Sequence, residues 1–126
     1  MAEPLFAVCV VDDDASVRTS TVRLLRELGY PAEAFDSAAA FLRRAPCSES
    51  CRLLLDVSMP TMDGLALARE LQRDGRRERV VFMSADGTEG IRRRIAEFGA
   101  IELVRKPFVV EELIGALIHA QPLPPP

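Results

Sequence analysis

The sequence predicts a doubly wound α/β sandwich, and two observations carry that prediction. Short apolar runs alternate with segments of helical periodicity along the whole 126-residue chain. The apolar runs are continuous, as is typical of strands buried on both faces of a parallel sheet. Parallel strands joined by helices require right-handed crossovers, which place helices on both faces of the sheet.

The first half of the chain contains three expected strands and two expected helices. The first strand covers Leu5–Val11 and the second covers Ala32–Phe35. Between them a helical stripe of apolar side chains predicts a helix, which Gly29 ends. Ala38–Arg44 is short but helix-prone, and a third strand is expected at Leu53–Leu55. The members of the first stripe are Val17, Thr21, Leu24, Leu25 and Leu28.

The second half continues the same alternation. Strands are expected at Val80–Met83 and Ile101–Val104, and helical stripes precede, separate and follow them. The stripes are Leu65, Ala68 and Leu71, ended by Gly75; Ile91, Ile95 and Phe98, ended by Gly99; and Val110, Leu113, Ile114, Leu117 and Ile118. The proline-rich residues 121–126 are expected neither to form a helix nor to pair in a sheet. They predict a stiff tail or a truncated linker after a domain of residues 1–120.

Composition excludes several classes of protein. An apolar share of 48% and a charged share of 28% are ordinary for a soluble globular domain, and argue against a disordered or collagen-like chain. No apolar run approaches the roughly 18 residues that span a membrane, and the first residues lack a signal-peptide pattern. We therefore expect a cytoplasmic protein without a membrane anchor. A net charge of −3 argues against direct nucleic-acid binding by this domain.

The three cysteines predict no metal site. Cys9 lies in an apolar run and is expected to be a small buried side chain. Cys47 and Cys51 are expected to be loop thiols, because a zinc site needs four ligands at recognisable spacings and His119 is the sequence's one histidine.

Polar and charged residues follow four of the five expected strands. In a parallel sheet the carboxyl ends of the strands meet at one edge, where ligands bind. The residues expected at that edge are Asp12, Asp13, Asp14, Asp56, Ser84 and Lys106. Taken singly, an Asp or Ser after a strand is often a helix cap or a turn residue, and we expect Asp14 to be a cap. Jointly, the set points to a site.

The chemistry of that set predicts phosphoryl transfer to a carboxylate. Converging carboxylates repel one another unless a cation lies among them, and oxygen ligands without nearby histidine or cysteine suit Mg²⁺. An aspartate can attack phosphorus to form an aspartyl phosphate. Ser84 could then donate a hydrogen bond to a phosphoryl oxygen, and Lys106 could neutralise charge on the phosphoryl oxygens.

The pattern resembles the receiver domains of bacterial two-component response regulators. The matching segments are Val11–Asp14, Leu55–Pro60 with Asp63-Gly64, Ser84-Ala85 and Lys106–Phe108. The resemblance runs from about Phe6 to His119, and the motif spacings are similar to those of the subgroup that precedes a helix-turn-helix output domain of the LuxR or NarL/FixJ type. It implies a flavodoxin/CheY-like (βα)5 three-layer sandwich with strand order 2-1-3-4-5.

The resemblance assigns an acceptor and a metal site. Asp56 would accept the phosphoryl group from a phosphohistidine of a sensor histidine kinase. Asp13 would bind Mg²⁺ (or Mn²⁺) directly, Asp12 mainly through water, and Asp56 would complete the carboxylate set. Ser58 would contribute its main-chain carbonyl.

It also assigns the groups that bind the phosphoryl oxygens. Ser84 would donate from its hydroxyl, Ala85 from its backbone N–H, and Lys106 would pair with the charge. The Lys106–Pro107 bond is expected to be cis, as is usual in this family. Pro60 and Gly64 would shape the loop beyond the acceptor.

One position departs from the family pattern. Three residues before the lysine the family commonly has Tyr or Phe, which turns inward as Ser84 moves toward the phosphate, whereas this chain has Leu103. We expect Leu103 to be chiefly a structural residue, with a switch role as the alternative. Ser58 and Asp86 are candidates for tuning the hydrolysis of the acyl phosphate, although Asp86-Gly87 could equally be a turn.

The resemblance implies a regulatory phosphoacceptor and not an enzyme acting on a free substrate. It would control transcription through a DNA-binding output domain outside this chain. A homodimer could form through the fourth helix, fifth strand and fifth helix, where the arginines Arg92–Arg94 form a basic cluster. Two alternatives stay open: an aspartyl-phosphate hydrolase, disfavoured because Ser58 stands where a general acid is needed, and an interaction scaffold that is never phosphorylated.

Overall fold

The computed structural model describes residues 6–44, 51–59, 62–85, 89–99 and 102–126. Within them strands and helices alternate five times, as the sequence predicts. The elements are β1 (Ala7–Val11), α1 (Ala15–Glu27), β2 (Ala32–Phe35), α2 (Ala38–Leu42), β3 (Cys51–Asp56), α3 (Gly64–Arg73), β4 (Arg79–Ser84), α4 (Glu89–Ala96), β5 (Glu102–Arg105) and α5 (Val110–His119).

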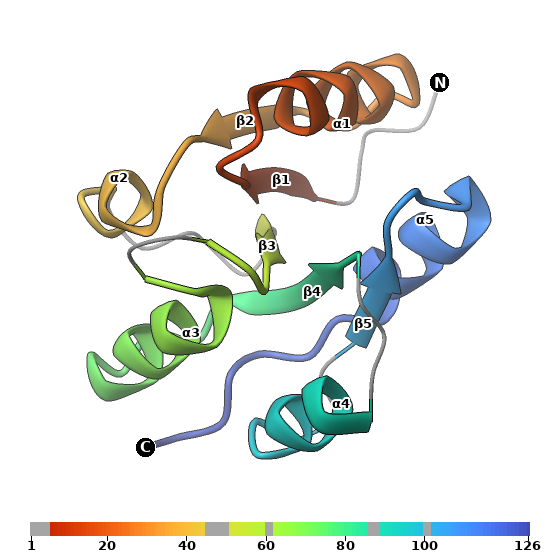
Figure 1. Ribbon diagram of the computed structural model, residues 1–126. Coiled ribbons are helices and arrows are strands. Elements are labelled where there is room, and N and C mark those ends of the chain that lie inside the picture. The colour runs from red at the N-terminus through yellow and green to blue at the C-terminus, as the bar shows by residue number, and fades with distance from the viewer. Residues whose placement is uncertain (1–5, 45–50, 60–61, 86–88, 100–101) are drawn as a thin grey trace.

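The five strands form one parallel sheet in the order β2-β1-β3-β4-β5 (Figure 1), which confirms the predicted fold class. The register aligns the strand ends. Val11 pairs with both Phe35 and Leu55, and Ser84 pairs with Arg105. The loops that follow β1, β3, β4 and β5 therefore share one edge of the sheet.

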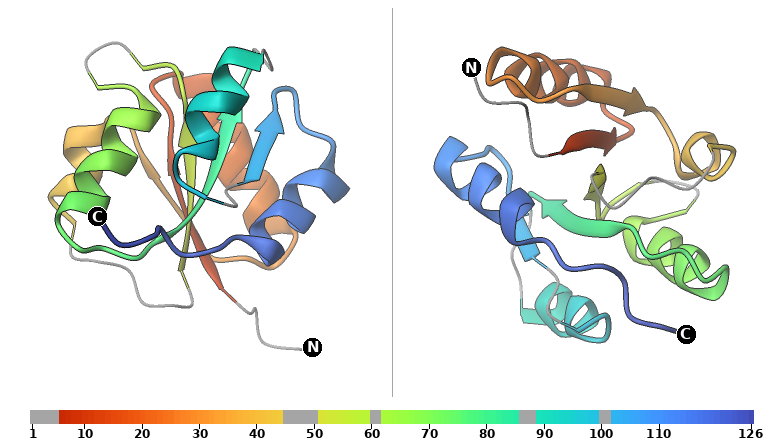
Figure 2. Two further views of the ribbon diagram at one scale, coloured as in Figure 1. Left: turned by 90° about the horizontal axis from the view of Figure 1, so that it is seen from below. Right: turned by 180° about the vertical axis from the view of Figure 1, so that it is seen from behind.

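Helices cover both faces of the sheet (Figure 2). Val8 and Val10 of β1 lie in a core cluster with Leu25 of α1 and Leu117 of α5. The side chains of Cys9 and Val11 alternate to the opposite face, whose cluster includes residues of α2, α3 and α4. Because every central strand is buried on both faces, its apolar run shows no polar alternation.

Capping residues begin the helices that carry the site, and glycines end them. Asp14 accepts hydrogen bonds at Oδ1 from the backbone N–H groups of Ser16 and Val17, which confirms its predicted capping role. Asp63 accepts from Ala66 in the same way before α3. The predicted stop residues have positive φ angles, as a left-handed helix terminus requires: Gly29, Gly75 and Gly99.

The predicted apolar stripes are wrong at three positions. Leu28 is 44% exposed because α1 ends at Glu27 and Leu28 already belongs to its C-terminal cap. Val110 and Ile118 of α5 are also exposed, and Ala116 takes the inward place beside Leu113 and Leu117. Helix α5 packs against the edge strand β5 and its neighbour β4, and only Leu113, Ala116 and Leu117 of this helix are buried.

Cys51 corrects a prediction. It opens β3 and is buried, with its Sγ 3.7 Å from Sγ of Cys9 on the neighbouring strand, so it is not a loop thiol. Strand β3 begins two residues before the predicted run because Cys51 and Arg52 pair with Ala7 and Val8 of β1. Cys47 lies outside the described residues.

The proline-rich residues 121–126 correct a second prediction. Pro122 forms an antiparallel bridge with Arg79 at the start of β4, although we expected no sheet pairing there. The backbone N–H of Leu123 donates to the Glu78 carbonyl at 2.9 Å, and the Leu123 side chain is fully buried in the core. The chain thus crosses the amino-terminal edge of the sheet after α5 and runs along it toward α3 (Figure 1).

Candidate functional site

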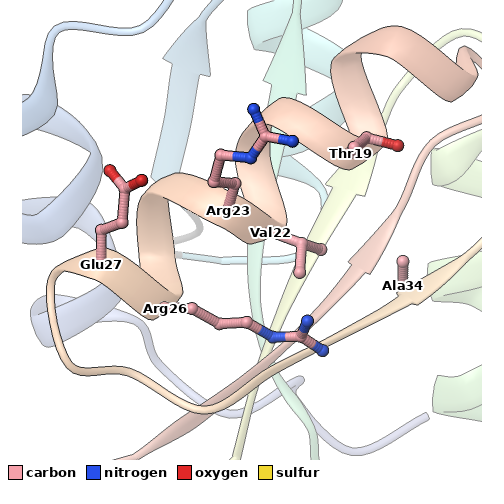
Figure 3. Close-up of a pocket in the computed structure, with 6 residues that line it drawn as sticks. All are labelled: Thr19, Val22, Arg23, Arg26, Glu27 and Ala34. Carbon is pink, nitrogen blue, oxygen red and sulfur yellow. The ribbon is translucent and has the colours of Figure 1, made fainter.

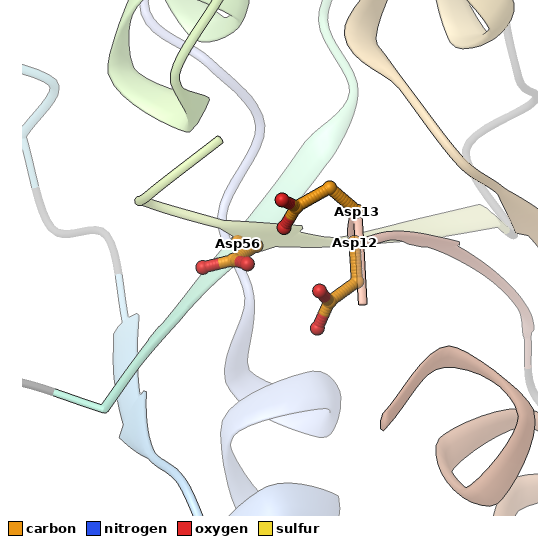
Figure 4. Close-up of side chains that lie close together, drawn as sticks. All are labelled: Asp12, Asp13 and Asp56. Atoms are coloured by element: carbon orange, nitrogen blue, oxygen red, sulfur yellow. The ribbon is translucent and has the colours of Figure 1, made fainter. Parts of the chain in front are cut away.

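Three carboxylates converge at the carboxyl edge of the sheet. Asp12 and Asp13 directly follow β1, and Asp56 is the last residue of β3. One oxygen from each lies within 4.8 Å of the others (Figure 4). Asp12 and Asp56 are buried, whereas Asp13 is exposed. The structure therefore brings together the acidic residues that the sequence places at separate strand ends.

The loop after β3 fixes the orientation of Asp56. The backbone N–H of Val57 still pairs with the Met83 carbonyl at 2.9 Å, and the Ser58 N–H donates to Oδ1 of Asp56 at 3.1 Å. Gly64 packs directly behind this turn, because a Cβ there would lie 2.3 Å from the Asp56 carbonyl oxygen. Only glycine allows the start of α3 to approach the acceptor strand so closely.

Lys106 supplies a positive charge from the fourth loop of the edge. Its Nζ lies 2.8 Å from Oδ2 of Asp12 and 3.2 Å from Oδ2 of Asp56. Its backbone N–H donates to the Ser84 carbonyl at 2.9 Å, which ties the β5 loop to the end of β4. The Lys106–Pro107 bond is cis, as expected.

Burial disfavours the charged form of both central groups, but its effect prevails only at Asp56. It raises the pKa of Asp56 to about 6, although the Ser58 N–H and the Lys106 charge favour the carboxylate. Burial also opposes the charged form of Lys106, but its hydrogen bond to Asp12 and the charge of Asp56 outweigh that effect and raise its pKa. The site is thus short of positive charge for the carboxylates that it holds.

The donor set fits a hard divalent cation. All three converging side chains offer oxygen, which Mg²⁺ prefers, and an exposed Asp13 leaves room for the water ligands that Mg²⁺ retains. Oδ1 of Asp12 is already held by the Asp14 N–H at 2.9 Å, and its Oδ2 by Lys106. That arrangement suits the predicted indirect, water-mediated role of Asp12.

Of the remaining predicted residues, the structure describes Ser84, Ala85 and Leu103. Ser84 ends β4 and is buried, and Ala85 follows it at the surface. Leu103 is half-buried on β5 and packs against the core cluster that contains Phe82 and Phe98, which suits its structural role. Asp86, Gly87 and Pro60 lie outside the described residues.

Two arginines near the edge were missed by the sequence reasoning. Arg18 on α1 donates from Nη1 to the Asp12 carbonyl at 2.8 Å. Arg94 on α4 lines one cavity with Asp13 and Ser58, although the sequence placed it only in a basic cluster. No signal in the sequence pointed to Arg18, and nothing in it distinguishes Arg94 from its two arginine neighbours.

A second cavity lies elsewhere on the surface. It measures about 590 Å³ between α1 and β2 (Figure 3), where its lining includes Arg23, Arg26 and Glu27. Arg26 already donates to the Ala32 carbonyl at 2.7 Å and 3.2 Å. The lining holds one carboxylate and lacks the converging acidic set, so the chemistry favours the strand edge.

Comparison with known proteins identifies a family that this chain matches. The family described as the response regulator receiver domain matches residues 8–118. Response regulator protein TodT of Pseudomonas putida is 34% identical over 125 residues, covering 99% of this chain and 55% of TodT. Transcriptional regulatory protein FixJ of Azorhizobium caulinodans is 35% identical over 111 residues, covering 87% of this chain and 52% of FixJ.

A solved structure extends the likeness to three dimensions. The response regulator StyR superimposes with a TM-score of 0.77 at 37% identity, covering 95% of this chain and 60% of that one. The chain spans about half the length of the curated relatives that it matches, TodT and FixJ.

Proposed function

Because this chain belongs to the receiver-domain family of response regulators, we propose that Asp56 is its phosphoacceptor. The observation that carries the proposal is the convergence of Asp12, Asp13 and Lys106 on that one carboxylate. Asp56 is the last residue of the central strand β3, and its Oδ1 is oriented by the Ser58 N–H. Its Oδ2 faces the lysine that can pair with an incoming phosphoryl group.

The reaction is an in-line displacement at phosphorus. An oxygen of Asp56 forms a bond to phosphorus as the bond between phosphorus and a donor histidine nitrogen breaks. The nitrogen keeps the electron pair, and the product is an acyl phosphate. Lys106, with Ser84 and the Ala85 N–H as further donors, would stabilise charge on the phosphoryl oxygens.

A divalent ion would be held by Asp13 and Asp56, with Asp12 through water and Ser58 through its carbonyl. Bound there, Mg²⁺ or Mn²⁺ neutralises charge between acceptor and phosphoryl group. Removing carboxylate repulsion also favours the ionised form of Asp56, which is the nucleophile. The same arrangement would promote hydrolysis of the acyl phosphate by water, with Ser58 and Asp86 setting its rate.

The partners follow from this role. A sensor histidine kinase would supply the phosphoryl group, and a DNA-binding output domain beyond this chain would control transcription. The length of the relatives, about twice that of the matched region, supports an additional domain. The face formed by α4, β5 and α5 is the proposed homodimer surface. Among the helices that the structure describes, none is long and apolar enough to cross a bilayer.

Labelling of Asp56→Asn tests the proposal. The wild-type chain should be labelled by acetyl phosphate with Mg²⁺, as measured by intact mass, and gain one phosphoryl group. Asp56→Asn replaces the nucleophilic carboxylate with a neutral amide and should abolish labelling. Asp14→Asn is the matched control, because it makes the same change at a neighbouring, exposed cap and should be labelled normally. Persistent labelling of Asp56→Asn would place the acceptor elsewhere.

A further inference from the structure

Helix α4 borders a cavity of about 480 Å³ that extends to the loops after β1 and β3. Asp13, Ser58 and Asp63 line that cavity from the sheet edge and the start of α3, and Arg94 lines it from α4. Nη2 of Arg94 lies 3.7 Å from Oδ2 of Asp63. The guanidinium therefore shares a cavity with two residues assigned to the metal and acceptor loops.

The ion pair of Arg94 is easily exchanged. Its two side chains are 51% and 36% exposed, and an exposed pair at this separation contributes little to stability. Asp63 also has a second task, because its Oδ1 accepts from the Ala66 N–H at 2.8 Å as the cap of α3. Asp63 can keep that cap when Arg94 leaves.

Phosphorylation would create a stronger partner for Arg94. Formation of the acyl phosphate removes the charge of the Asp56 carboxylate and introduces a group that carries about −1.5 to −2 charges. With Asp12 and Asp13 ionised, one divalent ion and Lys106 would leave the site about one negative charge in excess. A guanidinium supplies that missing charge and can bind two phosphoryl oxygens through its planar fork.

We propose that Arg94 is a phosphoryl-binding residue of this receiver, exchanging Asp63 for the phosphoryl group on Asp56. This inference rests on the proposed function of Asp56. The exchange would draw α4 toward the sheet edge when the site is phosphorylated, through a charge on α4 itself. The exchange gives the chain a direct link between the acceptor and α4. Leu103 on β5 offers no aromatic ring that could turn inward instead.

The three consecutive arginines of α4 provide a matched control. Arg92, Arg93 and Arg94 are all exposed, but of the three the structure places only Arg94 in the lining of this cavity. Arg93→Ala and Arg94→Ala each remove one positive charge from an exposed position on the same helix. Long-range electrostatics should affect both alike, so a difference between them reports direct contact.

Binding of beryllium fluoride with Mg²⁺, a mimic of the phosphoryl group, tests the inference by titration calorimetry. Arg94→Ala should weaken binding about tenfold or more, whereas Arg93→Ala should stay within about twofold of the wild type. Asp63→Asn keeps a capping oxygen but releases Arg94, so it should tighten binding severalfold. The same substitution in the Arg94→Ala background should change binding much less, because no guanidinium remains to release.

Two results would overturn the inference. Equal binding by Arg94→Ala and Arg93→Ala would show that Arg94 acts only through general charge. Equal effects of Asp63→Asn in both backgrounds would show that Asp63 does not compete for Arg94. Failure of the wild type to bind the mimic, together with labelling that survives Asp56→Asn, would instead refute the proposed function.

Discussion

Two requirements for the reactivity of Asp56 oppose each other: a fixed position and an ionised carboxylate. Asp56 must be buried and fixed beside Lys106 so that one oxygen faces the incoming phosphorus, yet burial favours its protonated, unreactive form. Lys106 offsets only part of that penalty because it is shared with Asp12. The ionised Asp56 that the chemistry requires therefore destabilises the folded state until a cation binds or the residue is phosphorylated.

That cost predicts a pH-dependent gain from Asp56→Asn. The pKa of Asp56 in the folded protein is about 6 against an ordinary value of 3.8, so ionisation destabilises the fold progressively as pH rises from about 4 to above 6. In chelator at pH 8, the variant should be more stable than the wild type by up to about 3 kcal/mol, and the gain should vanish near pH 4. Urea unfolding across that range measures it.

The matched control is Asp14→Asn, because Asp14 is exposed and asparagine is an equally good cap. Its effect on the free energy of unfolding should be small and should not grow between pH 4 and pH 8. A gain for Asp56→Asn that is the same at both pH values would show that burial does not raise the pKa of Asp56.

The sequence could predict those residues of the site whose position depends only on where a strand ends. Asp12, Asp13, Asp56 and Lys106 are at the edge because strands end there, and apolar runs show where strands end. Arg94 could not be predicted, because its contact with the cavity depends on how α4 is rotated about its axis. Three consecutive arginines give no preference for one of them.

At the scale of elements, the segment after α5 has more structure than its composition indicates. Proline-rich sequence argues against helix and sheet, and that reasoning fails here because one residue decides the outcome. Leu123 is fully buried in the core, and its N–H bonds to Glu78 at the start of β4. Gln72 of α3 reaches the carbonyls of Pro124 and Pro125 at 3.2 and 3.3 Å.

Leu123→Ala should therefore destabilise the domain. Removing a fully buried leucine side chain leaves a cavity and costs roughly 2–5 kcal/mol. Leu28→Ala is the matched control, since the same atoms are removed where the side chain is 44% exposed, and it should cost well under half as much. Chemical unfolding of the two variants measures the difference. Equal losses would mean that Leu123 is not anchored in the core.

At the scale of the whole molecule, the fold could be predicted because several signals agree. Continuous apolar runs, helical stripes and glycine stops all indicate alternating strands and helices, and parallel topology then limits the connections. The order β2-β1-β3-β4-β5 came from the resemblance and is confirmed. The exposed stripe positions Leu28 and Ile118 could not be foreseen, because periodicity shows an apolar side but not how wide a surface will cover it.

The edge of the sheet also links metal binding to the stability of the whole domain. Asp12, Asp13 and Asp56 come from strands at the centre of the sheet, so their repulsion opposes the native arrangement of β1 and β3. A cation that binds only the folded chain stabilises it by mass action, by about 2.7 kcal/mol at a hundred times its dissociation constant.

Mg²⁺ should therefore raise the midpoint of thermal unfolding, and chelator should reverse the rise and prevent labelling by acetyl phosphate. Asp13→Asn should greatly weaken the response, because Asp13 is the exposed ligand that the ion can reach most directly. Asp14→Asn should retain the response, because Asp14 is occupied as a helix cap. Undiminished labelling in chelator, or an equal response in Asp13→Asn and the wild type, would remove the metal from this site.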